Sequence, residues 1–200
     1  QESLTGYYRM IGGVDRELGK IREMLTKKGI AENTIIVWMG DNGSFLGERQ
    51  MAGKWLMYDN SVRVPLIIYD PRVKKHHDVE DMVANVDLAA TILDFSGVKS
   101  DLKTHGISLV PYVNNGSSKY KRKELMIEHL WDFQPIPPSE GIRTEQWKYF
   151  RYRTIKATEE LYDLENDPQE LNNLASNTKY KIILQNMRDK LDQKITLYSK

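Results

Sequence analysis

The sequence predicts an α/β fold, because helical and strand-like segments follow one another along its first hundred residues. Residues 3–28 carry apolar side chains at the three- and four-residue spacing of an amphipathic helix. Two continuous apolar runs rich in β-branched residues follow at 34–39 and 64–69, and a second helical segment begins at 87. The order helix, strand, strand, helix is typical of α/β architecture.

The first predicted helix spans residues 3–28. Ser3 or Thr5 can cap its start, and Gly29 is a natural stop because glycine readily adopts the left-handed conformation that ends helices. One apolar stripe runs along the predicted helix, and it consists of Tyr7, Ile11, Val14, Leu18, Ile21 and Leu25.

The runs at 34–39 (TIIVWM) and 64–69 (VPLIIY) predict strands. Their apolarity is continuous rather than alternating, which favours strands covered on both faces, as in a parallel sheet. Pro65 is compatible with the second run because the first residue of a strand need not donate to the ladder. Residues 81–97 then predict a short strand that turns into a helix at 87–93.

A polar, turn-forming stretch at 114–118 (NNGSS) is the best candidate for a domain boundary. We therefore divide the chain into a core piece, residues 1–115, and a small α+β subdomain, residues 116–200. The pattern of the subdomain predicts antiparallel strands at 124–128, 146–152 and 160–162 and a loop at the prolines of 135–138. It also predicts a helical turn at 167–170. A last helix is predicted from about 177, and the apolar residues on one of its faces are Ile183, Met187, Leu191 and Ile195.

The composition excludes several classes of function. The chain has 29 basic and 28 acidic residues, so its charge gives no reason to expect binding to nucleic acid or to an anionic membrane surface. It has no cysteine, which excludes disulfides, thiolate metal sites and a cysteine nucleophile within these residues. No apolar run approaches the roughly 18 residues that a membrane span requires, so we expect none.

The densest chemistry lies in Gly40-Asp41-Asn42-Gly43, directly after the predicted strand 34–39. Ligand sites of open α/β sheets form at the carboxyl ends of strands. A carboxylate beside an amide oxygen offers two hard ligands, which suit calcium or magnesium. Taken alone, the four residues more often form an ordinary Asn-Gly turn that binds no metal, because Asp-Asn-Gly is a common turn sequence.

Lys54 is the second candidate, because an ammonium on a flexible stem can contact an oxygen of a sulfate or phosphate. Taken alone, one lysine among many is more often a solvated surface charge, and the same holds for Arg63, Arg143 and Lys148. The four histidines have no metal-ligand spacing, so we expect them to lie in loops or to pack.

The stretch around these candidates closely resembles the type I, formylglycine-dependent sulfatases of the alkaline-phosphatase-like superfamily. In that family a strand ends in Asp-Asn-Gly and is followed by Leu-Gly-Glu, a Lys, and a Ser-x-Arg-Val-Pro-Leu strand. The resembling segments are NTIIVWMGDNGSFLGERQMAGKWLMYDNSVRVPLIIYDP, YYRMIGGVDRELGKI, NVDLAATILDFSGV, HGISLVPYV, GIRTEQWKYFRY and LYDLENDPQELNNLA, which together cover nearly the whole chain.

The resemblance implies a fold and a set of site residues. Residues 1–115 would be the C-terminal part of the family's catalytic core, a mixed sheet with flanking helices, and residues 116–200 its C-terminal subdomain, an antiparallel sheet with a final helix. Asp41 and Asn42 would be two ligands of a divalent ion, usually calcium in this family. Lys54 would contact the sulfate group, and Arg143 would meet a substrate group near the rim of the site.

One departure from the family pattern matters for activity. The family's formylglycine is made from Cys or Ser within Cys/Ser-x-Pro-x-Arg, and none of the seven prolines here has Cys or Ser two residues before it. We therefore expect the chain to be a C-terminal portion that lacks the nucleophile and shows no sulfatase turnover alone. With only two of the ligands, we expect it to bind calcium no more tightly than about millimolar.

The resemblance implies a sulfuric ester hydrolase, and a sulfated carbohydrate is the expected substrate. A phosphodiesterase or phosphonate monoester hydrolase of the same superfamily and a non-catalytic accessory module are the alternatives. The loop at 131–140 is expected to shape the rim of the pocket. Export to a periplasm or the cell exterior is a family-level expectation, and truncation would expose apolar surface through which the chain could self-associate.

Overall fold

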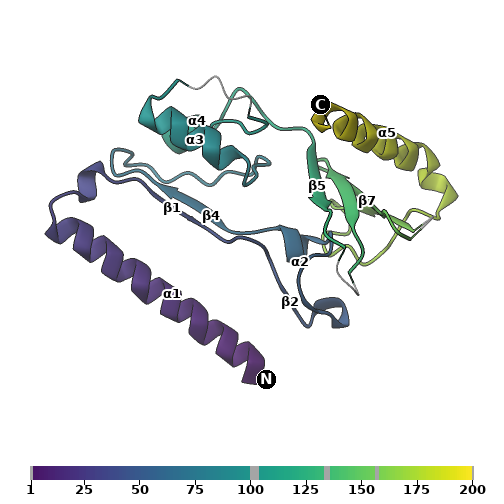
Figure 1. Ribbon diagram of the computed structural model, residues 1–200, viewed down its shortest axis with the longest axis horizontal. Coiled ribbons are helices and arrows are strands. Elements are labelled where there is room, and N and C mark those ends of the chain that lie inside the picture. The colour runs from purple at the N-terminus through teal and green to yellow at the C-terminus, as the bar shows by residue number, and fades with distance from the viewer. Residues whose placement is uncertain (1, 100–103, 133–135, 156–157, 200) are drawn as a thin grey trace. The chain divides into compact units, whose positions relative to one another are not determined.

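The computed structural model describes residues 2–99, 104–132, 136–155 and 158–199 (Figure 1). The described chain divides into two compact units, which we treat separately. Unit 1 comprises Gln1–Gly40, Pro65–Val79 and Leu109–Ser118, and unit 2 comprises Asp41–Val64, Glu80–Ser108 and Lys119–Lys200. The division of the chain at residue 115 that the sequence suggested stays a prediction.

Unit 1 opens with helix α1, Glu2–Lys27, which confirms the first predicted helix. Gly29 follows it with φ +70, the left-handed conformation expected at a helix end. A 3-10 turn, η1, spans Ala31–Asn33, and the short helix α4 spans Val110–Asn115. Among the described residues, no helix is long and apolar enough to cross a membrane.

The two strands of unit 1 are present, but the parallel arrangement expected for them is wrong. Strand β1, Ile36–Met39, pairs antiparallel with β4, Leu66–Tyr69. A parallel pair needs a crossover that returns the chain to the same end, usually a helix. The 26 residues between β1 and β4 instead hold only short elements: β2 (Phe45–Leu46), η2 (Glu48–Gln50), β3 (Ala52–Gly53) and α2 (Asp59–Val62).

Exposure along β4 agrees with the antiparallel pairing. Its residues alternate between half-buried and exposed, with Ile67 58% and Tyr69 45% exposed. Such alternation is typical of an antiparallel strand with one open face. The run of apolar letters identifies a strand but does not set its direction.

Unit 2 is built on a four-stranded antiparallel sheet in the order β5-β6-β7-β8. Strands β5 (Leu125–His129), β7 (Trp147–Tyr152) and β8 (Glu159–Asp163) confirm the three predicted strands. Strand β6, Ser139–Arg143, is an addition, and two residues expected in the 131–140 loop belong to it. Residues 133–135, including the first proline of the predicted 135–138 loop, lie outside the described residues.

Both faces of this sheet are covered within unit 2. Helix α5, Lys181–Tyr198, lies along one face (Figure 1) and forms the core cluster Ile142, Tyr149, Leu161, Leu184, Met187 and Leu191. It is preceded by the 3-10 turn η3, Thr178–Tyr180, and it confirms the last predicted helix. On the opposite face the segment 41–58, which contains the predicted site residues 41, 42 and 54, packs into a second cluster: Phe45, Met57, Tyr58, Phe150, Tyr162 and Leu164. The predicted site residues therefore belong to a segment anchored on a sheet.

Helix α3, Asp87–Ser96, confirms the helix predicted at 87–93, but the short strand expected before it is not formed. The fully buried carboxylate of Asp87 explains the difference. It accepts the backbone N–H of Ala84 at 2.7 Å and that of Ile107 at 2.9 Å, and it pairs with Arg122. The loop before α3 thus directs a backbone group to this carboxylate rather than to a neighbouring strand.

The helical turn predicted at 167–170 is a tight turn without a helix. The Asp167 carboxylate accepts the N–H groups of Leu171 at 3.0 Å and Asn172 at 2.7 Å, so it acts as a local cap. Glu170 takes φ +55, which a helix excludes, and its side chain is 1% exposed. The turn therefore serves to bury an acidic side chain.

Candidate functional site

The predicted metal ligands directly follow β1. The amide of Asn42 donates from Nδ2 to the carbonyl of Gly43 at 2.7 Å, which leaves its Oδ1 as an acceptor. That oxygen accepts from Nζ of Lys54 at 2.9 Å. Asp41 is exposed, and its Oδ1 accepts the N–H of Asn42 at 2.8 Å. Asn42 and Lys54, which are twelve positions apart in the sequence, are thus in direct contact.

Helix α2 holds the two backbone segments that carry Asn42 and Lys54, and we call residues 42–43 the first arm and residues 54–55 the second arm. The carbonyl of Ser61 accepts the N–H of Gly43, and the hydroxyl of Ser61 accepts the N–H of Trp55, both at 2.8 Å. Ser61 is 3% exposed. Each arm is therefore bonded, one residue beyond its functional side chain, to the same buried serine.

The approach of the first arm to α2 requires glycine. A Cβ placed on Gly43 would lie 2.1 Å from the carbonyl oxygen of Asn60, far inside contact distance. The second arm is unusual in a different way, since Trp55 has φ +84, a conformation that bulky residues rarely adopt. The bond from Trp55 to Ser61 helps to hold this strained backbone in place.

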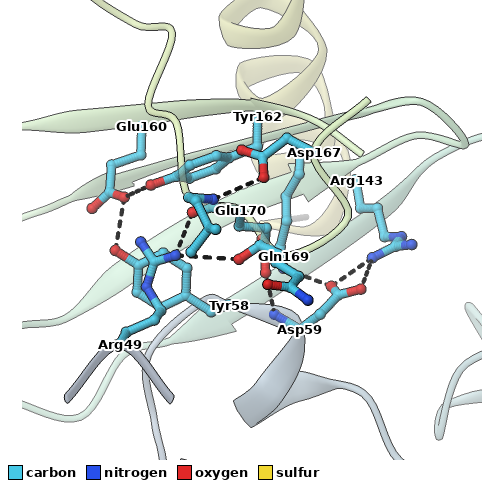
Figure 2. A network of polar contacts seen from close by, with 11 residues as sticks. Arg49, Tyr58, Asp59, Arg143, Glu160, Tyr162, Asp167, Gln169 and Glu170 are labelled. Carbon is cyan, nitrogen blue, oxygen red and sulfur yellow. Dashed lines mark hydrogen bonds and ion pairs between the residues drawn. The ribbon is translucent and has the colours of Figure 1, made fainter. Parts of the chain in front are cut away.

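A buried ionic network lies at the start of α2 (Figure 2). The carboxylate of Asp59 accepts from Arg143 Nη1, with one contact at 2.7 Å, and from Lys148 Nζ at 2.8 Å. Lys148 also pairs with Glu170 at 2.8 Å, and Glu170 accepts the backbone N–H of Asp59 at 2.6 Å. Lys148 and Glu170 are each 1% exposed. The network ties α2 to strands β6 and β7 and to the turn before α5.

The charges of this network set the ionisation of Asp59. Burial by itself raises the pKa of the Asp59 carboxyl, but the charge and hydrogen bond of Lys148, with those of Arg143, lower it further than burial raises it. The net pKa therefore lies below the usual value for aspartate, and Asp59 stays ionised.

A second acidic centre, Glu160, is shared by tyrosines. Its carboxylate accepts from the hydroxyl of Tyr58 at 2.8 Å, from Tyr152 at 3.1 Å and from Tyr162. Burial, followed by the nearby Glu160 charge, raises the pKa of the Tyr58 hydroxyl. The guanidinium of Arg49 lies beside the Tyr58 ring (Figure 2), and its distance from the ring centre is 3.9 Å. These tyrosines are hydrogen-bond donors at neutral pH.

The structure gives two sequence candidates contacts that the sequence did not reveal. Lys148, read as a solvated charge, is instead buried, because it lies on the same face of β7 as Phe150. Arg143 forms an ion pair with Asp59, and its side chain is 24% exposed. Its expected contact with a substrate stays a prediction.

Ser61, Asp59 and Glu170 were missed as site-supporting residues. A signal for Ser61 was present in the Ser-x-Arg-Val-Pro run, where a small polar residue precedes a strand. A signal for Lys148 was its place between aromatic residues in WKYFRY. Neither letter pattern reveals which partner the polar group finds across the fold.

The donors near Asp41 fit part of a metal site. A carboxylate and an amide oxygen are hard ligands, while calcium takes roughly six to eight oxygens. Within the ranges that the structure describes, no cluster of three or more His, Asp or Glu side chains is arranged to hold a metal. Asp41 and Asn42 could supply two ligands of such a site.

The histidines behave largely as expected. His76 is exposed and contacts Asp78 at 2.9 Å, His105 stacks on Tyr198, and His129 stacks on Trp55. These are loop and packing contacts, which agrees with the absence of ligand spacing in the sequence.

Comparisons with known proteins agree on one family. The family model described as N-sulphoglucosamine sulphohydrolase, C-terminal, matches residues 47–196. The N-acetylglucosamine-6-O-sulfatase of Bacteroides thetaiotaomicron is 32% identical over 185 residues, which cover 90% of this chain and 33% of that protein. The chain thus spans about a third of the length of the curated relatives it matches.

Solved structures share the fold. The structure of BT4656 in complex with its substrate D-glucosamine-2-N,6-O-disulfate matches with a TM-score of 0.83 at 30% identity, over 94% of this chain and 39% of that one. The phosphonate monoester hydrolase of Agrobacterium radiobacter matches with a TM-score of 0.82 at 29% identity, over 94% of this chain and 40% of that one. The predicted fold class, an α/β portion with an antiparallel sheet and a C-terminal helix, is confirmed.

Proposed function

The chain belongs to the sulfatase family of the alkaline-phosphatase-like superfamily, and we propose that it forms the C-terminal part of a sulfuric ester hydrolase. The observation that carries this proposal is the bond from Lys54 Nζ to Asn42 Oδ1, at 2.9 Å. It joins a cationic donor to an oxygen suited to a metal. Such a pair is suited to neutralising an anionic ester from two sides.

Members of the family generally use a metal ion and a formylglycine residue. We propose that Asp41 and Asn42 hold a divalent ion, with calcium favoured by their oxygen donors. The amide oxygen of Asn42 has two lone pairs, so its bond with Lys54 leaves one for a cation. When bound, the ion would draw negative charge from the sulfate oxygens.

Lys54 is proposed to contact the sulfate group. Its ammonium is a compact charge on a flexible stem, and a short rotation can redirect it from Asn42 to a substrate oxygen. Arg143 is proposed to meet another substrate group, on the basis of the family resemblance. Its Nη1 donates a hydrogen bond to Asp59. A guanidinium has five N–H donors in all, so this bond does not use up its capacity to donate.

The nucleophile is proposed to lie outside these 200 residues. None of the seven prolines has Cys or Ser two positions before it, so the formylglycine motif does not occur in this sequence. What this chain would contribute is recognition: oxygen ligands from Asp41 and Asn42, a cation from Lys54, and the scaffold of α2 that holds them together.

A sulfated carbohydrate is the proposed substrate class. The proposal is supported by a relative named as an N-acetylglucosamine sulfatase and by a structural neighbour solved with a sulfated glucosamine. Because homologous sulfatases are generally secreted or periplasmic, we also propose a periplasmic or secreted location.

The test uses the full-length protein that carries this sequence, with calcium present. It would be assayed on glucosamine 2-N-, 3-O- and 6-O-sulfates, a 2-O-sulfated uronate, choline sulfate, p-nitrophenyl sulfate and phenyl phenylphosphonate, with release of sulfate or phenol measured. Hydrolysis of at least one sulfated sugar with higher kcat/KM than the phosphonate is expected. Turnover of the phosphonate alone would contradict the proposal.

That second outcome corresponds to the alternative function, a phosphonate monoester hydrolase. The observation that favours it is the match to the Agrobacterium radiobacter enzyme, whose TM-score nearly equals that of the sugar-sulfate complex. The fold alone thus does not distinguish the two esters, and the substrate panel does.

A further inference from the structure

Trp55, His129 and Trp131 form a group of contacting rings that we call the aromatic cluster, and its Trp55 ring lies near Lys54. The Trp55 ring stacks on His129 with centroids 6.0 Å apart and planes at 7°. The Trp131 ring meets Trp55 at 5.6 Å and 69°. The Lys54 ammonium lies 5.8 Å from the centre of the Trp55 ring. The cluster is therefore continuous with the proposed sulfate contact.

Trp131 remains 60% exposed despite this contact. Exposing so large an indole forgoes much of the stabilisation that burial would supply, so an exposed ring that is nonetheless fixed in place suggests a binding surface. Trp131 follows β5 by two residues, and His129 at the end of that strand pairs with Ser139 of β6. The sheet thus anchors one side of the cluster.

The other side of the cluster is fixed by the strained backbone of Trp55. Its φ of +84 and the bond from its N–H to the buried hydroxyl of Ser61 set the direction in which its side chain leaves the backbone. A bulky residue kept in such a conformation favours a functional role for the side chain it orients. The cluster is therefore supported from both the sheet and helix α2.

We propose that Trp131 and Trp55 form the subsite for the sugar ring of the substrate whose sulfate Lys54 contacts, and this rests on the proposed function. A pyranose has a flat face of C–H groups and a polar rim, and an indole offers a matching apolar face with one N–H donor. A sulfate ester is joined to its sugar through one oxygen. Any ring bound with its sulfate at Lys54 must therefore lie within a few ångströms of that side chain, next to Trp55, which Trp131 contacts.

A quaternary ammonium such as choline is the other ligand that aromatic rings commonly bind. The position of Lys54 argues against it here. Its ammonium already lies near the Trp55 ring, and it would repel a second cation at close range. A neutral or anionic sugar carries no such penalty.

The experiment compares full-length wild-type protein with Trp131→Ala, Trp131→Leu and Trp131→Phe on the best sulfated sugar of the panel. Trp131→Ala and Trp131→Leu are expected to lower kcat/KM about tenfold, mainly through KM, equivalent to about 1.4 kcal/mol. Trp131→Phe, which keeps a flat ring, should retain most of the activity. Inhibition by inorganic sulfate, which has no ring, should keep its Ki within about twofold in all three.

Tyr120→Ala is the matched control, because Tyr120 is 78% exposed and outside the cluster, and its kinetics should match the wild type. The inference is overturned if Trp131→Leu leaves kcat/KM unchanged, if it raises the Ki of sulfate as much as the KM of the sugar, or if choline sulfate is the substrate that loses more. A wild-type protein that hydrolyses no sulfate ester overturns the proposed function, and the subsite with it. Should Trp131→Ala not fold, the Leu and Phe variants decide the question.

Discussion

At the scale of single residues, the candidate site depends on a few side chains that the sequence does not mark as special. Ser61 carries no charge. It nevertheless accepts hydrogen bonds from backbone N–H groups of both arms of the site. Asp41, Asn42 and Lys54 could be selected from the sequence because carboxylate, amide and ammonium groups have evident chemistry. The residues that place them could not, because their partners are known only once the chain has folded.

Replacing Ser61 with alanine should weaken the second arm. The N–H of Trp55 would lose its acceptor in a buried setting, so the free energy of unfolding should fall by about 1–3 kcal/mol in a urea titration. Ser96→Ala is the control, since Ser96 is an exposed serine whose hydroxyl donates to Leu93, and it should change stability by no more than about 0.5 kcal/mol. Equal effects of the two changes would contradict a special role for Ser61.

Asp59 should make the protein sensitive to acid. Its pKa is lowered in the folded state, so its contribution to stability is present above the unfolded value and is lost as pH falls through the folded value. The model-compound value is 3.8, so the difference in unfolding free energy between wild type and Asp59→Asn should shrink as pH falls below about 4. Chemical denaturation at pH 2.5 to 6 measures it. A difference that grows toward low pH would contradict the assigned direction.

At the scale of elements, the spacing of apolar residues predicted the helices, whereas it did not predict how the strands pair. The apolar stripes of α1 and α5 were readable because a helix places every third or fourth side chain on one face. The antiparallel pairing of β1 and β4 was not, since a continuous apolar run suits either direction. Strand β6 was missed because Ser-Glu-Gly has low strand propensity. The glycine is there because a Cβ on Gly141 would come within 2.8 Å of Phe150 on the neighbouring strand.

The ionic network that joins α2 to β7 should make Lys148 essential for stability. Lys148→Met would leave the Asp59 and Glu170 carboxylates without their buried cation, and unfolding free energy should fall by about 3–5 kcal/mol. Lys121→Met removes a lysine from a pair in which it is 52% exposed, and it should cost at most about 1 kcal/mol. Thermal and urea unfolding of both variants test this, and a cost below about 1 kcal/mol for Lys148→Met would show that the network does not hold the elements together.

At the scale of the whole molecule, the family could be identified from the ordered motifs, whereas the domain division at residue 115 stays a prediction. Helix α1 illustrates why a sequence that covers only about a third of the length of its relatives is hard to interpret alone. Several of its apolar side chains, Met10, Ile11, Val14, Ile21 and Met24, are 46–65% exposed. Ile11, Val14 and Ile21 belong to the stripe that correctly predicted the helix, so the stripe did not predict what covers these side chains.

These exposed apolar side chains of α1 lead us to expect that the 200-residue chain by itself self-associates. Apolar surface of this kind favours contacts between copies, so sedimentation velocity should show dimers or larger species at micromolar concentration. Ile21→Glu, together with Met10→Glu, should shift the distribution toward monomer, while Tyr120→Ser, at an exposed site outside α1, should not. A monomeric wild-type chain over this range would contradict the expectation.

The most direct test of the central claim is the rate of sulfate release by the full-length protein with Lys54→Ala, measured on the sulfated sugar that the wild type hydrolyses best. Loss of a cation that stabilises the transferring sulfate should lower kcat/KM at least about 100-fold. Lys179→Ala, at an exposed lysine, should leave it unchanged. A Lys54→Ala protein that releases sulfate at the wild-type rate would contradict the proposal that Lys54 contacts the sulfate group.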